Sequence, residues 1–284
     1  MEMGATSVLC ETTEFLGAEH ILARRAANKE VHDKIYKIVY DYEESLKRIG
    51  QGGFGYVEKV ELQNSDGGIC GIYARKVFAP QDPSYRDEFI RRFEREVTYQ
   101  ADCSHTNIVP IYIHHLEGET PWFVMDLAES DLVAELGSGQ FTIRDKLSAI
   151  KMILQGVAYL HDHDYWHRDL KPQNVLRFAD GTYKISDFGL VKNADKKAES
   201  EVITKVASIM GTERYMAPEV FAGIYSEKTD IYALGVLIED MELSAVPGID
   251  DLITKSTARK PTKRHATVHE MLYDLDKIVK GNGL

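Results

Sequence analysis

The most constraining feature of this chain is the run Trp166–Asn174, which Asp187-Phe188-Gly189 follows thirteen residues later. Phosphoryl transfer needs cations that neutralise a polyphosphate and a carboxylate that accepts the proton of the attacking hydroxyl. Asn174 and Asp187 carry the hard oxygen atoms that Mg²⁺ prefers. Asp169 is placed to act as the base, and Lys171 can steady the transferred group. The order and spacing of these residues predict a phosphotransfer site.

A glycine-rich run lies upstream, between Gly50 and Val57, and reads Gly-Gln-Gly-Gly-Phe-Gly-Tyr-Val. Glycines let backbone amides approach phosphate oxygens, because no Cβ stands in the way. Alone this signal is weak, since a glycine-rich hairpin without a ligand is the simpler interpretation. A dinucleotide-binding fingerprint would open a helix after a strand. Here a second strand is expected instead, so the run predicts a β-hairpin flap over a nucleotide.

Lys76 lies on the strand expected after this flap, and Ala74 shares its face by period-two alternation. A lone lysine on a strand is usually only solvated, so a carboxylate partner is the discriminating feature. Glu96 qualifies, because it shares a helix side with Phe89 and Phe93 and would face inward. A buried charge without a partner would be costly. We therefore expect Lys76 and Glu96 to pair.

The order of expected elements divides the chain into a β-rich first half and an α-rich second half, joined near Leu127 to Ser130. Residues 1–41 are expected to be a helical extension, with the helix running from Glu19 to Tyr42. Packing of that helix on the main domain is the favoured interpretation, and a dimerisation or regulatory helix is the alternative. Residues 42–127 and 128–284 are expected to form two lobes. Ile231–Ile238 is apolar on all sides and predicts a buried helix.

Taken together, these motifs resemble the eukaryotic-type protein kinase family, serine/threonine branch, over about Tyr42 to Leu284. The resemblance implies an α+β bilobal fold: a small antiparallel sheet with one main helix, a larger mostly helical lobe, and ATP in the cleft between them. It implies ATP and Mg²⁺ as cofactors, with Mn²⁺ as an alternative ion. It assigns catalytic roles to Asp169, Lys171, Lys76, Glu96 and Thr212, and magnesium ligation to Asn174 and Asp187.

The resemblance also implies a set of nucleotide-binding residues. Met125 resembles the gatekeeper, the backbone of Asp126 and Ala128 would bind adenine, and Asp131 is similar to the ribose contact. The nucleotide-binding residues on this basis are Gly50, Gly52, Gly53, Phe54, Gly55, Val57, Ala74, Lys76, Met125, Asp126, Ala128 and Asp131. Asp230 matches the buried aspartate that supports the catalytic loop, and Glu219 is expected to pair with Arg264.

Lys171, two residues after the expected base, and Thr212 point to serine or threonine as the acceptor residue. Both inferences follow from the family pattern. Arg168 precedes the base, and family members balance such an arginine with a phosphate on the activation loop. Ser208 stands at the usual phosphosite position, and Thr204 is the next candidate. Either hydroxyl could instead be a solvated loop residue. We expect regulation by (auto)phosphorylation of this loop.

Two departures from the family pattern affect what can be carried over. Gln100, four residues after Glu96, stands where the family usually has a hydrophobic residue, so the active helix position is expected to need support. The stretch between Ile238 and Arg264 is short, which makes substrate recognition by analogy unsafe. The histidines at 161, 163 and 167 are more simply packing residues than metal ligands.

The composition restricts partners and compartment. The charge sum of 34 − 45 = −11 disfavours nucleic acid as a partner. No apolar run approaches the roughly 20 residues of a membrane span. Three cysteines without metal-site spacing favour a reducing compartment, so a cytoplasmic location is expected. The expected partners are protein substrates with serine or threonine acceptors, and a homodimer through the N-terminal helix is an alternative to a monomer.

Two other functions compete with an active kinase. A pseudokinase would bind partners without transferring phosphate. The presence of Lys76, Glu96, Asp169, Asn174 and Asp187 argues against this alternative. A small-molecule phosphotransferase of related fold would generally lack both the glycine-rich flap and the Ala217-Pro218-Glu219 segment. The acidic residues Glu129, Asp131 and Glu135 hint weakly at basic substrate peptides.

Overall fold

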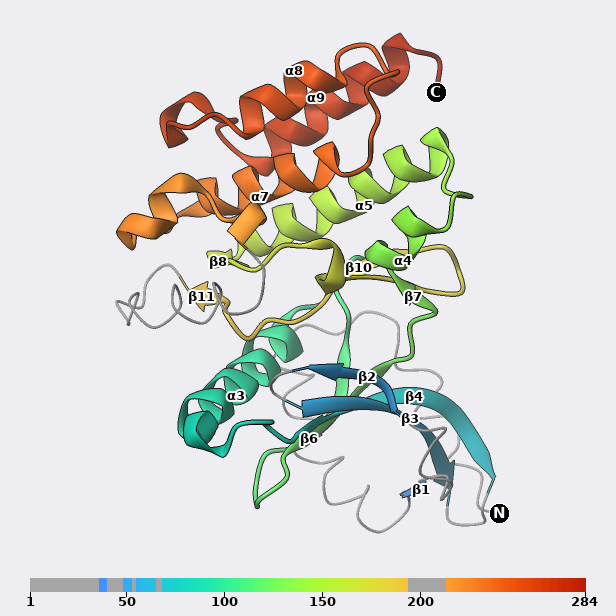
Figure 1. The fold of residues 1–284 in the computed structure, drawn as a ribbon. Coiled ribbons are helices and arrows are strands. Elements are labelled where there is room, and N and C mark those ends of the chain that lie inside the picture. Colours follow the sequence, from blue (N-terminus) through green and yellow to red (C-terminus); the bar gives the residue numbers. More distant parts are fainter. Residues whose placement is uncertain (1–35, 40–47, 53–54, 65–67, 194–212) are drawn as a thin grey trace.

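The chain folds into two lobes, seen in a computed structural model that describes residues 36–39, 48–52, 55–64, 68–193 and 213–284 (Figure 1). An antiparallel sheet and one long helix make up the N-lobe, and a mostly helical C-lobe follows it. Each lobe has its own cluster of buried apolar side chains. The α+β class and the bilobal arrangement predicted from the motifs are confirmed. Within the described residues, no helix is long and apolar enough to cross a bilayer.

The N-lobe sheet has six strands, of which five follow the order β1-β3-β4-β6-β5, and β2 also pairs with β3. The pairs between neighbouring strands in this sheet are antiparallel. The hairpin expected around the glycine-rich run is β2 with β3, and the next strand β4 carries Lys76. The strands are β1 (Tyr36–Val39), β2 (Arg48–Gly52), β3 (Gly55–Asn64), β4 (Ile69–Phe78), β5 (Ile111–His115) and β6 (Trp122–Asp126).

The N-terminal helix expected from Glu19 to Tyr42 is wrong at its C-terminal end. Tyr36–Val39 form the strand β1, which pairs antiparallel with Glu61–Asn64 of β3. Residues 36–39 are Tyr-Lys-Ile-Val, and β-branched and aromatic residues suit a strand once an unpaired edge is available. The rest of the predicted helix lies outside the described residues. The sheet of the N-lobe therefore begins before the boundary expected at residue 42.

Helix α3 (Arg86–Asp102) packs its apolar side on this sheet, after the short 3-10 turn η1 (Pro83–Tyr85). The ring of Phe93 lies 5.6 Å from that of Phe78 and 5.4 Å from that of Phe123. Phe93 and Val97 are buried, as expected for an amphipathic helix with one apolar stripe. This packing fixes which side of α3 faces β4, and Glu96 lies on that side.

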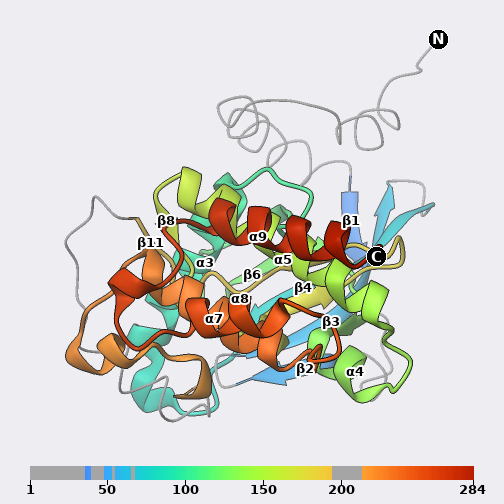
Figure 2. The ribbon, with the colours of Figure 1, turned by 90° about the horizontal axis from the view of Figure 1, so that it is seen from above.

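The C-lobe is built around α5 and α7, with α9 lying alongside α5 and α8 beside α7 (Figure 2). A capping box, in which Thr142 and Asp145 exchange hydrogen bonds, starts α5. The buried helix predicted at Ile231–Ile238 is confirmed as the core of α7. The C-lobe helices are α4 (Leu132–Gly137), α5 (Ile143–Asp162), α7 (Glu227–Glu239), α8 (Ile249–Ser256) and α9 (Val268–Gly281).

Short strands and turns line the side of the C-lobe that faces the N-lobe (Figure 1). Strands β9 and β10 form an antiparallel hairpin that turns at Asp180-Gly181. The strands are β7 (Ser130–Asp131), β8 (Tyr165–Trp166), β9 (Val175–Arg177), β10 (Tyr183–Ile185) and β11 (Lys192–Asn193). The 3-10 turns are η2 (Pro172–Asn174), η3 (Glu213–Tyr215), η4 (Pro218–Ala222) and η5 (Pro261–Lys263).

Candidate active site

The pair predicted between Lys76 and Glu96 is present. The Lys76 Nζ atom lies 2.6 Å and 2.8 Å from the two carboxylate oxygens of Glu96, and 3.9 Å from Oδ1 of Asp187. Burial opposes the charge on Lys76, but the carboxylates of Asp187 and Glu96 outweigh burial and raise the pKa of the lysine. Burial raises the pKa of Glu96, against the effect of the lysine. Lys76 holds the proton of this pair, because its ammonium group faces two carboxylates.

The residues of the run Trp166–Asn174, called the catalytic run from here on, meet at Asp169. Lys171 Nζ lies 2.9 Å from Asp169 Oδ2, and the amide nitrogen of Asn174 donates to the same oxygen over 3.1 Å and to the Asp169 carbonyl over 2.8 Å. The amide nitrogen of Asn174 is thereby occupied, and its amide oxygen is the atom that remains available to a ligand. The 3-10 turn η2 between Lys171 and Val175 brings these groups together.

Two nearby carboxylates have opposite pKa shifts. Burial, reinforced by Asp187, raises the pKa of Asp169 above its ordinary value. Burial alone would also raise the pKa of Asp187, but the ammonium groups of Lys76 and Lys171 outweigh it and lower that pKa. Carboxylates with opposite shifts at one site suit different roles. Asp169 can accept a proton, whereas Asp187 stays ionised as a cation ligand does.

Asp230 of α7 holds the backbone of the catalytic run. Its carboxylate accepts hydrogen bonds from the backbone N–H groups of His167 and Arg168, both over 2.8 Å. The third contact is His161 Nε2, at 2.9 Å, from the last turn of α5. Arg168 has a φ of 67°, a left-handed conformation that these two bonds help to hold. Sequence reasoning assigned the support to Asp230 correctly but treated His161 as a packing residue.

The residues predicted to surround adenine lie around one apolar cluster. Ala74 and Met125 are buried and are cross-strand partners in β4 and β6, and Val57 and Ala128 pack against the same cluster. Leu176, from β9 of the C-lobe, joins this cluster. Sequence reasoning did not single out Leu176. The available signal was its position on the strand that directly follows Asn174.

The glycine flap has the predicted hairpin form on the residues that the structure describes. Gly50 pairs with Val57, and Gly52 pairs with Gly55. Gly55 has a φ of 156°, and a Cβ there would overlap the carbonyl oxygen of Val77. A side chain is therefore excluded at Gly55 by the close approach of β4. Gly53 and Phe54 lie outside the described residues.

The segment that joins the lobes holds two further predicted residues. The side chain of Asp126 accepts a hydrogen bond from the Tyr112 hydroxyl over 2.7 Å and contacts Lys184 Nζ at 3.0 Å. Asp131 is the N-cap of α4, where Oδ1 accepts from the Ala134 N–H over 2.8 Å. One carboxylate oxygen of Asp131 is thus used by the helix, which leaves the other for a ligand.

The expected pair of Glu219 and Arg264 is confirmed as a two-pronged ion pair, with distances of 2.6 Å and 2.8 Å. Thr212 and the candidate phosphosites Ser208 and Thr204 lie outside the described residues, so their predicted roles stay predictions. Arg168, the arginine expected to respond to a loop phosphate, stacks over the ring of Tyr225 at 4.3 Å.

Comparison with protein families agrees with this site. Residues 43–275 match the protein kinase domain, which is most of the chain, and the chain therefore belongs to the protein kinase family. A second match, to the C-terminal part of D-galactarate/altronate dehydratase, covers residues 1–78 only. This match covers less than half of the chain and overlaps the kinase match. In the overlapping part, the structure shows the paired strands β2, β3 and β4 of the N-lobe sheet.

The chain is also similar to serine/threonine-protein kinases of bacteria. It is 27% identical to a probable serine/threonine-protein kinase of Clostridium perfringens, over 87% of this chain and 39% of that protein. It is 28% identical to the serine/threonine-protein kinase PrkC of Bacillus subtilis, over 81% of this chain and 39% of that protein. A third relative is the serine/threonine-protein kinase PknL of Mycobacterium tuberculosis, at 29% identity over 68% of this chain and 56% of the relative. The chain thus spans about two fifths to somewhat over half of the length of these relatives.

Proposed function

We propose that this chain transfers the γ-phosphate of ATP to serine and threonine hydroxyls of protein substrates. The observation that carries the proposal is the approach of Lys76 to both Glu96 and Asp187, within 2.6 Å and 3.9 Å, beside a base held by Lys171. A lysine pinned in this way is positioned for nucleotide phosphates. The serine/threonine relatives and the Lys171 position support the acceptor class.

The residues at the site fit a divalent cation. Asp187 offers an ionised carboxylate and Asn174 an amide oxygen, the ligand types that Mg²⁺ takes and that Mn²⁺ also accepts. When bound, the ion would neutralise charge on the nucleotide phosphates. Asp169 would take the proton of the substrate hydroxyl, and Lys171 would hold Asp169 in place and face the transferred group. Lys76 would orient the nucleotide.

The test is incubation with labelled ATP, Mg²⁺ and a peptide library, comparing wild type with Asp169→Ala. Label on serine and threonine peptides from wild type, with loss of label in the variant, is the expected result. Nucleotide binding with no transfer by wild type would favour the alternative, a pseudokinase that binds nucleotide and partners. Label on sugars or aminoglycosides and none on peptides would favour a small-molecule phosphotransferase.

We further propose that phosphorylation of Ser208 or Thr204 regulates the chain. Mass spectrometry of the purified protein after phosphatase treatment, and again after ATP addition, tests this idea. Phosphate that appears on neither residue contradicts it.

The homodimer predicted through the N-terminal segment is tested by sedimentation of the full chain, where a monomer mass at micromolar concentration would contradict it. A cytoplasmic location stays a prediction from cysteine usage.

A further inference from the structure

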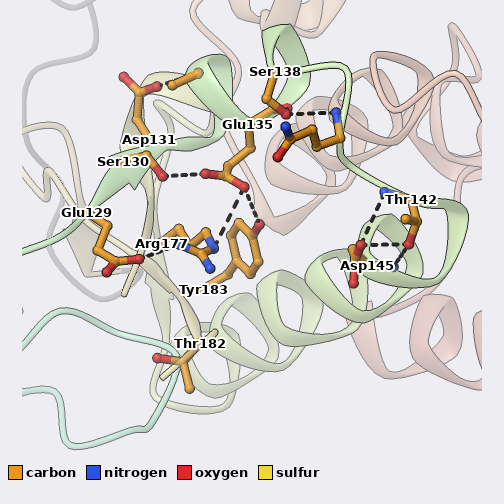
Figure 3. A network of polar contacts seen from close by, with 12 residues as sticks. Glu129, Ser130, Asp131, Glu135, Ser138, Thr142, Asp145, Arg177, Thr182 and Tyr183 are labelled. Atoms are coloured by element: carbon orange, nitrogen blue, oxygen red, sulfur yellow. Dashed lines mark hydrogen bonds and ion pairs between the residues drawn. The ribbon is translucent and has the colours of Figure 1, made fainter. Parts of the chain in front are cut away.

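A polar network on the C-lobe gathers around Glu135 of α4, beside the segment that joins the lobes. Figure 3 shows Ser130, Arg177 and Tyr183 pointing toward the Glu135 carboxylate. Ser130 Oγ donates to Oε1 over 2.5 Å, and the Tyr183 hydroxyl donates to Oε2 over 3.3 Å. Arg177 Nε lies 3.7 Å from the same Oε2. One carboxylate therefore ties one helix to three strands.

The strand register explains why these three residues share a face. Ser130 of β7 is opposite Arg177 of β9, which is opposite Tyr183 of β10. Residues directly opposite in a sheet point to the same side. This row meets α4, and burial together with Glu135 raises the pKa of Tyr183, which keeps its hydroxyl a donor.

The neighbouring row of the same sheet faces the other way. Asp131 is opposite Leu176, which is opposite Lys184. Leu176 packs against the apolar cluster of the N-lobe that contains Ala74 and Met125, and Lys184 contacts Asp126 of β6. Successive side chains on a strand point to opposite faces. The row that contains Asp131 therefore faces the cleft between the lobes, while the row that contains Ser130 faces α4.

Two contacts with α4 hold Asp131 and its neighbour Ser130 in place. As the N-cap of α4, Asp131 accepts the Ala134 N–H, and Glu135 fixes the first turn of α4 against the sheet. The acidic residues that hinted at basic substrates are thus partnered within the fold, since Arg177 also bonds to Glu129. We infer that Glu135 is a positioning residue for nucleotide binding, which holds Asp131 so that its carboxylate accepts hydrogen bonds from the ribose hydroxyls of ATP. This inference rests on the proposed ATP-dependent function.

The experiment compares the affinity of the full chain for ATP and for 2′,3′-dideoxy-ATP, which lacks both ribose hydroxyls. Wild type is expected to favour ATP about tenfold, because a charged acceptor contributes strongly to each hydrogen bond. In Glu135→Ala that ratio is expected to fall to about twofold, as Asp131 loses its fixed direction. Glu135→Gln keeps an acceptor oxygen and is expected to restore part of the ratio.

Matched variants separate positioning from stability. Asp276→Ala also removes an ion-paired carboxylate, which lies on α9 at 2.9 Å from Lys151 of α5, and is expected to keep the wild-type ratio. Asp131→Ala is expected to abolish the preference, and adding Glu135→Ala should then change nothing, as for two residues acting through one contact. If Glu135→Ala fails to fold, Ser130→Ala removes one contact of the network and is expected to lower the ratio partly.

Several results would overturn the inference. An unchanged ratio in folded Glu135→Ala or Ser130→Ala contradicts it, and so does an equal loss of affinity for both nucleotides. A wild type without preference for ribose hydroxyls removes the role of Asp131 and with it that of Glu135. A raised KM only for arginine-containing peptides would assign Glu135 to peptide docking. Failure of wild type to bind either nucleotide instead refutes the proposed function.

Discussion

Gln100 is a buried side chain whose hydrogen bonding is half satisfied. Its amide nitrogen donates to the Val109 carbonyl over 2.9 Å, whereas its amide oxygen has no partner among the described residues. An unpaired buried acceptor costs about 1–3 kcal/mol. Gln100 lies on α3, the helix that carries Glu96. The penalty therefore falls on the helix position that forms the pair with Lys76.

We expect Gln100→Leu to raise basal phosphotransfer about fivefold. The change removes the unpaired oxygen but also loses the bond to Val109, worth about 1 kcal/mol, so the net gain is about 1 kcal/mol. Initial rates of peptide phosphorylation at fixed ATP measure the effect. The control is Gln155→Leu, an exposed glutamine on α5, which should leave the rate unchanged. No change in Gln100→Leu would mean that α3 already occupies its inward position fully.

At the scale of elements, the contact between α7 and α8 is unusually close. A Cβ added at Gly235 would lie 2.7 Å from Cβ of Ser256 and 2.8 Å from Cγ2 of Thr257. These distances are too short for carbon atoms, so one of the two helices would have to move. The same helix α7 carries Asp230, which supports the catalytic run. Glycine at position 235 thus sets how closely the outer C-lobe helix packs.

Gly235→Ala is expected to destabilise the chain by about 1–3 kcal/mol, because overpacking forces backbone shifts. Gly137→Ala is the matched control, since no atom lies within 4 Å of a Cβ there. It is expected to stabilise by about 0.4–1 kcal/mol through the unfolded chain. Denaturant unfolding of both variants measures the change in unfolding free energy, which should be negative for Gly235→Ala and positive for Gly137→Ala. Equal effects at both positions would show that the α7–α8 contact can relax.

The joint between α8 and α9 contains a buried histidine. His265 Nδ1 lies 3.0 Å from Ser256 Oγ of α8, and Nε2 lies 3.3 Å from Asp274 Oδ2 of α9. Burial, then Lys255, lower the pKa of His265 below its ordinary 6.5, although Glu270 and Asp274 oppose this. Ser256 Oγ also donates to the Leu252 carbonyl over 2.9 Å, and Nε2 of the histidine makes no hydrogen bond within the described residues. Lys228 of α7 donates to the His265 carbonyl.

We expect this histidine to make the chain less stable at acid pH. Since its folded pKa is lowered, the unfolded chain binds the proton first. The stabilisation is complete above the ordinary pKa of 6.5 and is lost as pH falls through the folded value. Unfolding free energies between pH 7.5 and 5 should show a steeper fall for wild type than for His265→Gln. Parallel curves for the two proteins would contradict this sign.

At the scale of the whole molecule, the site is divided between the lobes. Lys76 and Glu96 come from the N-lobe, whereas Asp169, Asn174 and Asp187 come from the C-lobe. The contacts between Lys76 and Asp187 and between Asp126 and Lys184 cross from one lobe to the other. A ligand that touches both sets of residues would bind only the closed arrangement. Binding should therefore stabilise both lobes together.

ATP with Mg²⁺ is expected to raise the unfolding free energy by about 2.7 kcal/mol at a hundredfold excess over Kd. ATP with a chelator should give much less, because the phosphates then face Asp187 unneutralised. Thermal unfolding with each addition measures the increments. Asp187→Asn should lose the magnesium-dependent part and keep some response to ATP. A magnesium increment that survives in this variant would place the cation elsewhere.

The sequence alone determined the residues that act within short motifs. The run at 166–174, the glycine flap and the pairing of Lys76 with Glu96 could all be predicted, because each follows from residue type, spacing and one inward-facing helix side. The buried helix around Ile231–Ile238 was equally clear from its apolar character. These features depend on local chemistry, which the order of residues carries directly.

Tertiary structure decided the features that depend on distant partners. Tyr36–Val39 became a strand because an edge of β3 was available to pair with it, which no local window reveals. His161 became a hydrogen-bond partner of Asp230, which lies 69 residues away in the sequence. Glu135 meets Tyr183 only because three short strands align in register. Hydrogen bonds form between groups that folding brings together, and their energy depends on that proximity.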